Sequence, residues 1–166
     1  MATHPTTTTN VSELFKQTAG KAIGRIPSGV FILTAAHGGE TAAIMASWVQ
    51  QCGFEPPAVS VALGKGRPIG ELINASQKFA LSIVGEDDTS LMKRYARGVK
   101  PGEDPFAGVE TLTTPAGIPA LKSALAWLEC RLLKTCDFGG DHDLLIGQVT
   151  DGLVLRPGPA FAHQRG

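Results

Sequence analysis

The chain has 166 residues, 43% of them hydrophobic and 18% charged, and its 15 basic residues equal its 15 acidic residues in number. This length and composition predict one globular domain that buries its own core. The net charge of zero argues against general binding to nucleic acid or to an anionic membrane, because both need a basic surplus or a basic face.

The first residues and the cysteines bear on where the protein works. Residues 1–10, MATHPTTTTN, form a polar tail without the basic and apolar regions of a secretory signal, so we expect the domain itself to span residues 11–166. No window approaches the ~18 apolar residues of a transmembrane helix. The three cysteines have neither the pairing of a disulfide framework nor a zinc-site spacing. These features predict a reducing compartment, the cytoplasm, and no membrane association.

The first half of the chain reads as one helix followed by closely spaced strands. Apolar residues at three- and four-residue steps predict an amphipathic helix over residues 11–26, with Pro27 at its end. Residues 29–36 and 41–49 then read as two strands joined by a glycine-rich turn. A third strand is expected at 58–63, a short helix at 69–74 and a fourth strand at 79–84.

The second half continues the β pattern around one more helix. That helix runs to about Arg97, and its basic end fits the helix dipole, with contact to the phosphates of a nicotinamide cofactor as the alternative. Residues 98–114 read as a loop, and strands are expected at 124–137, 144–150 and 153–155. Six or seven strands lie too close in sequence for helical crossovers. They therefore predict a mainly β fold, a closed antiparallel barrel, in place of a parallel α/β sheet.

Two polar clusters follow predicted strands and raise the question of a binding site. They are Ser47-Trp48-Val49-Gln50-Gln51 and Gly64-Lys65-Gly66-Arg67. A core tryptophan and a solvated turn are the simpler interpretation. A phosphate, however, needs a cation and free donors, and a flat heteroaromatic ring needs apolar contact with polar groups along its edge. The clusters favour a phosphorylated aromatic cofactor such as FMN, and the chain has neither a GxGxxG nor a GxxxxGK[ST] motif.

Several segments, in this order, carry a resemblance to a known family. They are GRIPSGVFILTA, MASWVQQ with PPAVSVAL, LINASQKFALSIV, ALAWLEC and GDHDLLIGQV. Together they resemble the flavin reductase-like family, and most closely the flavin reductase module at the C-terminal end of photosynthetic flavodiiron proteins. The resemblance implies a split β-barrel with a few short helices. It also implies a homodimer that holds FMN, or FAD, near its interface and takes electrons from NADH or NADPH.

The resemblance also implies roles for individual residues. Those expected to line the edge of the isoalloxazine ring are Met45, Ala46, Ser47, Trp48 and Val49. Those expected near the ribityl phosphate are Leu63, Gly64, Lys65, Arg67, Asn74 and Ser76. His142, in a Gly-Asp-His sequence, is expected beside the flavin face on which nicotinamide stacks, which makes it the candidate catalytic residue. Hydride transfer between two cofactors needs orientation and exclusion of water from the protein, and no nucleophile triad is evident in the sequence.

Three functions remain open at this point. The first is an NAD(P)H:flavin oxidoreductase, and the second is an FMN-binding electron carrier that docks on a partner oxygenase or diiron protein. The third is a barrel for another ligand such as haem or pyridoxal phosphate. A metal site at Asp141-His142-Asp143 is disfavoured because adjacent strand residues point to opposite faces. The sequence does not decide between NADH and NADPH, between bound and exchanging flavin, or among electron acceptors.

Overall fold

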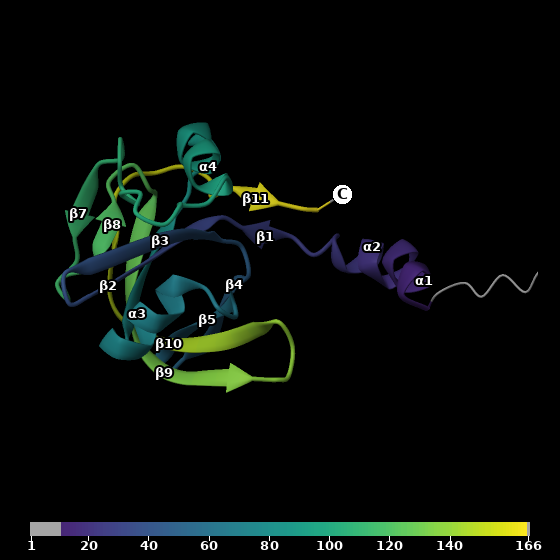
Figure 1. Ribbon diagram of the computed structural model, residues 1–166. Coiled ribbons are helices and arrows are strands. Elements are labelled where there is room, and N and C mark those ends of the chain that lie inside the picture. The colour runs from purple at the N-terminus through teal and green to yellow at the C-terminus, as the bar shows by residue number, and fades with distance from the viewer. Residues whose placement is uncertain (1–10, 166) are drawn as a thin grey trace, which may run out of the picture.

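The computed structural model describes residues 11–165 and consists mainly of antiparallel strands (Figure 1). The helices are α1 (Val11–Gln17), α2 (Ala19–Ile23), α3 (Pro68–Ser76) and α4 (Thr89–Ala96). The strands are β1 (Ser28–Gly29), β2 (Phe31–His37), β3 (Glu40–Ala46), β4 (Val49–Phe54), β5 (Pro57–Gly64), β6 (Lys78–Ile83), β7 (Thr111–Thr113), β8 (Pro119–Leu121), β9 (Ala126–Asp137), β10 (His142–Val154) and β11 (Ala162–His163). The predicted polar tail, with His4, lies outside the described residues. In the part of the chain that is described, no helix is long and apolar enough to cross a membrane.

Seven strands form one sheet in the order β3-β2-β6-β9-β10-β5-β4. Its two edges, β3 and β4, are separated in sequence only by Ser47 and Trp48. Three Cα steps span at most ~11 Å, whereas flat strands in this order would hold the edges ~29 Å apart. The sheet must therefore curl until its edges approach each other, and β3 does contact β5, the neighbour of β4. The barrel predicted from the sequence is confirmed.

The barrel interior is filled by one apolar cluster. Its buried members include Leu33, Val61, Phe79, Leu81 and Leu145, contributed by four strands. Alternation places every second side chain of a strand on the same face, so these residues share the concave side. Helix α3 covers one end of this interior by burying Ile69 and Ile73, in a segment where Pro68 occupies the first helical turn.

A second apolar cluster lies outside the barrel and fixes α4 and the β7–β8 hairpin to it. Ile32 belongs to this cluster although its neighbour Leu33 faces the interior, so β2 is buried on both faces. Two buried hydroxyls connect the hairpin to the sheet: Thr34 Oγ1 donates to the Pro119 carbonyl at 2.6 Å, and Ser82 Oγ accepts from the Leu121 N–H at 3.0 Å. Burying these hydroxyls costs little because each is hydrogen-bonded.

The strands differ from the sequence prediction at three places. The stretch expected as one strand over 41–49 stops at Ala46, and β4 starts afresh at Val49 after the turn between the sheet edges. The segment read as a loop contains β7, which pairs with β8. The Asp151-Gly152 pair, read as a turn between two strands, instead lies inside β10, where a register shift lets the strand continue.

The predicted amino-terminal helix is two short helices that project from the barrel (Figure 1). Thr18 separates them, and its hydroxyl donates to the Leu14 carbonyl at 2.8 Å, a local bond that competes with regular helix geometry. The apolar residues of this arm do not pack on the barrel, since Phe15 and Ile23 are 58% and 61% exposed. The periodicity predicted helix correctly, but not that the apolar side would lack a partner within the described residues.

Gly147 on β10 allows Phe79 to fill the barrel. A Cβ at this position would lie 2.5 Å from the Phe79 ring and 3.0 Å from the Cys130 Cβ, and both neighbours are fully buried. We expect Gly147→Ala to lower the free energy of unfolding by roughly 1–3 kcal/mol, since a packed core cannot yield at low cost. Urea unfolding followed by circular dichroism measures this change.

The matched control is Gly70→Ala in α3. A Cβ there meets only Leu63 Cδ2, at 3.5 Å, and a helical alanine is preferred over glycine by roughly 0.5–1 kcal/mol. Gly70→Ala should therefore leave stability unchanged or raise it. Equal losses in the two variants would contradict the packing account.

Candidate functional site

Strand β5 lies at the centre of the candidate site, and each of its two edges is paired with a site residue. On one side the Ala62 N–H donates to the Trp48 carbonyl at 3.0 Å. On the other side Gly64 pairs with His142 in the β5–β10 register. Ala62 and Gly64 are on the face of β5 opposite Val61 and Leu63, the residues of the barrel core. Small residues on this outer face leave space beside the strand.

Trp48, His142 and Arg165 form one continuous wall over that space. The indole and imidazole centroids are 5.0 Å apart with the rings inclined at 48°. The Arg165 guanidinium lies 4.7 Å from the centroid of the indole ring, a cation–π geometry. The His142 Nδ1 is 2.9 Å from the Asp141 carboxylate, whose pKa is lowered chiefly by this hydrogen bond. The carboxylate fixes the ring orientation and leaves Nε2 free for another partner.

These residues border a cavity of about 520 Å³ between the end of β5 and the end of α4. Pockets of several hundred Å³ suit cofactors and drug-sized ligands. The predicted site residues that line it are Met45, Ala46, Ser47, Trp48, Leu63, Gly64, Arg67 and His142. Residues from distant parts of the sequence complete it, namely Ile26, Ser28, Ile44, Ala62, Pro68, Tyr95, Ala96, Arg97, Gly98, Val99, His163 and Arg165.

The lining of the cavity is cationic. Among the described residues it includes Arg67, Arg97 and Arg165 but neither aspartate nor glutamate. Arg97 is ion-paired with Glu103 at 2.7 Å, whereas no carboxylate in the described part of the chain pairs with Arg67 or Arg165. Two guanidinium groups without an internal counter-ion give the cavity an affinity for anions.

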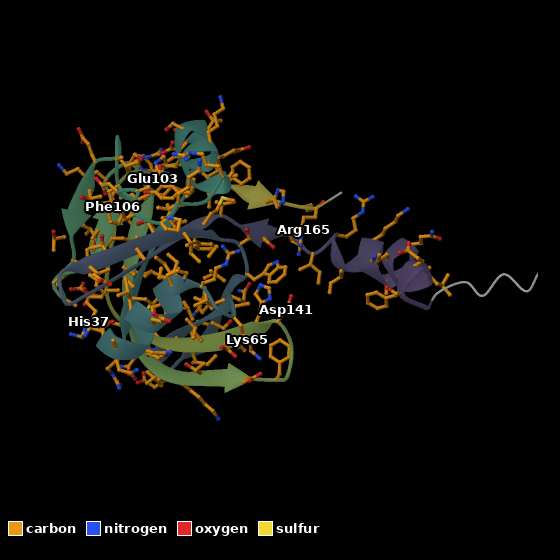
Figure 2. The ribbon with its side chains drawn as sticks, in the orientation of Figure 1. His37, Lys65, Glu103, Phe106, Asp141 and Arg165 are labelled. Carbon is orange, nitrogen blue, oxygen red and sulfur yellow. The ribbon has the colours of Figure 1, made fainter. Side chains whose placement is uncertain are left out.

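Lys65 occupies a different position from the one expected for a phosphate ligand. Its ammonium is 2.7 Å from the Asp137 carboxylate and 3.9 Å from that of Asp143, and it does not line the cavity. Lys65 is labelled beside β10 in Figure 2. The hydrogen bond with Asp137 is the main cause of the raised pKa of Lys65. This ion pair holds Lys65 beside the turn between β9 and β10. Of Lys65 and Arg67, Arg67 alone lines the cavity.

Three other predicted residues are also away from the cavity. Val49 packs against the barrel core at the start of β4. Asn74 and Ser76 lie in the last turn of α3, while Arg67 and Pro68 begin that helix. The helix rise of 1.5 Å per residue puts roughly 12 Å between its ends. Ser76 Oγ donates to the Lys78 carbonyl at 3.1 Å, which occupies its hydroxyl. The structure does not bring these three residues to the cavity.

The sequence missed residues that reach the cavity through long-range contacts. Strands β1 and β11, which the sequence did not predict, pair Ser28 with His163. This pairing brings Arg165 to the cavity. The sequence did indicate one further lining residue. Arg97 belongs to the basic end of α4, for which contact with the phosphates of a nicotinamide cofactor was the alternative, and Arg97 does line the cavity. Its neighbour Tyr95 is buried, which raises the pKa of its phenol to about 12.

No metal site accompanies this cavity within the described residues, where no group of three or more His, Cys, Asp or Glu side chains could hold an ion. The geometry defines a small split barrel with an anion-accepting cavity at its rim. The family model described as "Flavin reductase like domain" matches residues 23–166, which include every strand of the barrel. The chain therefore belongs to the flavin reductase-like domain family, and the family predicted from the sequence is confirmed.

Known relatives agree with this membership. Diflavin flavoprotein A 1 of Synechocystis sp. is 42% identical over 147 residues, which are 87% of this chain and 26% of that protein. The chain thus spans about a quarter of the length of this relative. The styrene monooxygenase flavin reductase of Pseudomonas putida S12 superposes with a TM-score of 0.74 and 25% identity, over 89% of this chain and 93% of that chain. The NADH:FAD oxidoreductase of Streptomyces globisporus C-1027 shares the fold, with a TM-score of 0.82 and 24% identity over 91% and 89%.

Titration of Asp137 tests the position of Lys65. The hydrogen bond from Lys65, followed by that from the Gly139 N–H, lowers the pKa of the Asp137 carboxyl. The pair therefore stabilises the fold above the ordinary aspartate pKa, and this contribution is lost as pH falls through the lowered value. We expect Lys65→Met to raise the titration midpoint of Asp137, followed by carbon-detected NMR. Arg67→Met is the control and should leave it unchanged; the opposite result would contradict the ion pair.

Proposed function

We propose that the protein is an NAD(P)H-dependent flavin reductase that binds FMN in the cavity at the rim of its barrel. The observation that carries this proposal is the combination of an indole and an imidazole with two unpaired arginines around one cavity that no described carboxylate lines. An aromatic ring system with a negatively charged tail is the ligand class that such a lining suits. Membership of the flavin reductase-like family supports the same ligand.

FMN fits the residues at both of its chemical ends. The isoalloxazine ring would lie along the end of β3 and the Ser47–Trp48 connection, where Met45 offers apolar contact and Ser47 a hydroxyl. The phosphate would bind near Arg67, which precedes Pro68 at the start of α3 and has no ion pair within the described residues. Lys65 contributes less in this proposal, because Asp137 and Asp143 already neutralise it.

His142 is the residue assigned to the reacting face. With both cofactors bound, the chemistry is transfer of a hydride, two electrons and one proton, from nicotinamide C4 to flavin N5. The task of the protein is to align the two rings and to exclude water. His142 is suited to alignment because Asp141 holds its Nδ1 and Trp48 lies against its ring. A flavin held beside Met45 and Ser47 would supply the two electrons for a downstream acceptor.

The proposal includes a homodimer and a separate electron acceptor. The apolar arm and the zero net charge are compatible with self-association. A styrene monooxygenase flavin reductase and a diflavin flavoprotein are among the similar proteins, which supports an oxygenase or another flavoprotein as the acceptor. NADH is the donor named for one structural neighbour, and the choice between NADH and NADPH is left to experiment.

An anaerobic titration with reduced nicotinamide tests this function. We expect the purified protein to bind added FMN, and the flavin absorbance near ~450 nm to bleach within seconds of mixing with NADH or NADPH. His142→Ala should slow this bleaching without weakening FMN binding, because the imidazole is assigned to the nicotinamide side. Bound flavin that neither nucleotide reduces would replace the reductase with an electron carrier, and a protein that binds no flavin would refute both.

A comparison of two cations tests the FMN phosphate position. Arg67→Gln is expected to raise the FMN dissociation constant roughly tenfold, the usual effect of losing a charge-assisted hydrogen bond. Lys65 lies two residues before Arg67 but is already paired with Asp137, so Lys65→Gln should change the constant much less. Fluorescence quenching of FMN on binding measures both constants. Riboflavin, which lacks the phosphate, is the control ligand and should bind both variants equally; a larger effect of Lys65→Gln would move the phosphate site.

A further inference from the structure

The last described residue of the chain, Arg165, is placed at the cavity by an ordered strand pairing. β11 pairs with β1, and the segment then passes the arm so closely that a Cβ on Gly24 would lie 2.7 Å from the Arg165 carbonyl oxygen. Its guanidinium lies over the Trp48 ring, on the side of the barrel from which the arm leaves (Figure 2). The tail is therefore part of the cavity wall.

Among residues 11–165, the guanidinium of Arg165 interacts with the indole face and has no ion pair or hydrogen bond. Cation–π contacts of this kind contribute roughly 0.5–1 kcal/mol at exposed sites, and Trp48 is 44% exposed. Two other arginines show the contrast: Arg156 pairs with Asp87, and Arg94 in α4 donates to the Asp104 and Pro105 carbonyls. Arg165 keeps its planar set of N–H donors for an anion, and an anion can draw it from the indole at low cost.

Arg165 and Arg67 occupy opposite ends of one row of side chains. A Cβ on Gly64 would lie 3.6 Å from Arg67 Nε and 3.8 Å from His142 Nε2, which places Arg67 next to His142. His142 contacts Trp48, and Trp48 contacts Arg165. In this chain of neighbouring side chains, the imidazole and the indole come between Arg67 and Arg165. One phosphate monoester can engage one end of this row, which leaves the other end for a second anionic group.

We propose that Arg165 binds the phosphate groups of the nicotinamide dinucleotide, while Arg67 binds the phosphate of the flavin. This assignment rests on the proposed function and divides its two ligands between the two ends of the row. Arg97 is the competing cation for the dinucleotide, but it is 2.7 Å from Glu103, whose pKa is lowered by the Lys100 N–H and by Arg97 itself. A guanidinium already engaged by a carboxylate gains less from a phosphate than one resting on an indole.

Trp48 supplies a direct readout of this binding that requires no flavin and no turnover. The chain has two tryptophans, and the other, Trp127, is 6% exposed on β9 and does not line the cavity. We expect ADP, which has the diphosphate but not the nicotinamide, to change the indole fluorescence of the flavin-free protein as Arg165 leaves the ring. Adenosine 2′,5′-bisphosphate and inorganic phosphate are titrated in parallel, and the Trp48→Phe variant should lose the signal.

Three variants separate the dinucleotide phosphate from the flavin phosphate. Arg165→Gln should raise the dissociation constant of ADP and the KM for NADH or NADPH roughly tenfold, and leave that of FMN within about twofold. Arg67→Gln should do the reverse. Arg25→Gln, in the arm and outside the cavity lining, is the matched control and should change neither. Equilibrium dialysis with ADP gives the affinity of Arg165→Gln independently of fluorescence.

Each result either supports or overturns the assignment. An effect of Arg165→Gln on FMN rather than on ADP would make Arg165 a flavin ligand, and an unchanged ADP constant would remove it from the site. A larger effect of Arg97→Gln than of Arg165→Gln on ADP would transfer the role to α4. Tighter binding of adenosine 2′,5′-bisphosphate than of ADP, lost in Arg165→Gln, would assign the contact to the 2′-phosphate and hence to NADPH. If the protein binds ADP but no flavin, the proposed function fails while the ADP result still stands.

Discussion

The two-residue connection between β3 and β4 is the constraint on which the rest of the structure depends. It joins the opposite edges of the sheet, so the sheet has to curl and the core has to form inside the curl. The same connection carries Trp48 to the rim, where its carbonyl accepts a hydrogen bond from the Ala62 N–H on β5. The two-residue length of this connection therefore constrains both the curl of the sheet and the position of Trp48. A longer loop at this position would remove both constraints.

The backbone of β5 and β10, next to this connection, forms part of the cavity. The β5–β10 register fixes His142 opposite Gly64, and the Arg67 side chain and the imidazole both lie beside this glycine, 3.6 and 3.8 Å from where its Cβ would be. Larger residues at Ala62 or Gly64 would fill the space that the ring of a ligand needs. The part of the cavity wall that β3, β5 and β10 form belongs to the seven-stranded sheet, and rigid strands hold a site more accurately than loops do.

The sequence predicted the parts of this arrangement that depend on local pattern, and missed those that depend on distant pairing. Alternation and turn residues indicated the barrel strands, and the Trp48 and His142 segments were recognisable as motifs. Lys65 and Arg67 look equivalent in the sequence because both follow a glycine, and only the β9–β10 turn, which supplies Asp137, distinguishes them. Arg165 gave no signal at all, because its position depends on a pairing between β1 and β11 that no local periodicity encodes.

The charge distribution shows why a chain with zero net charge can still select an anion. The acidic residues are equal in number to the basic ones, but they act locally: Asp137 neutralises Lys65, Glu103 neutralises Arg97, and Asp87 neutralises Arg156. Arg67 and Arg165 have no such partner in the described chain, and both line a cavity that no described carboxylate lines. Selectivity for an anionic ligand then depends on which cations lack partners, and total charge does not measure it. Because such exposed charges are screened over ~8–10 Å at physiological salt, the preference acts only on a ligand already within the cavity.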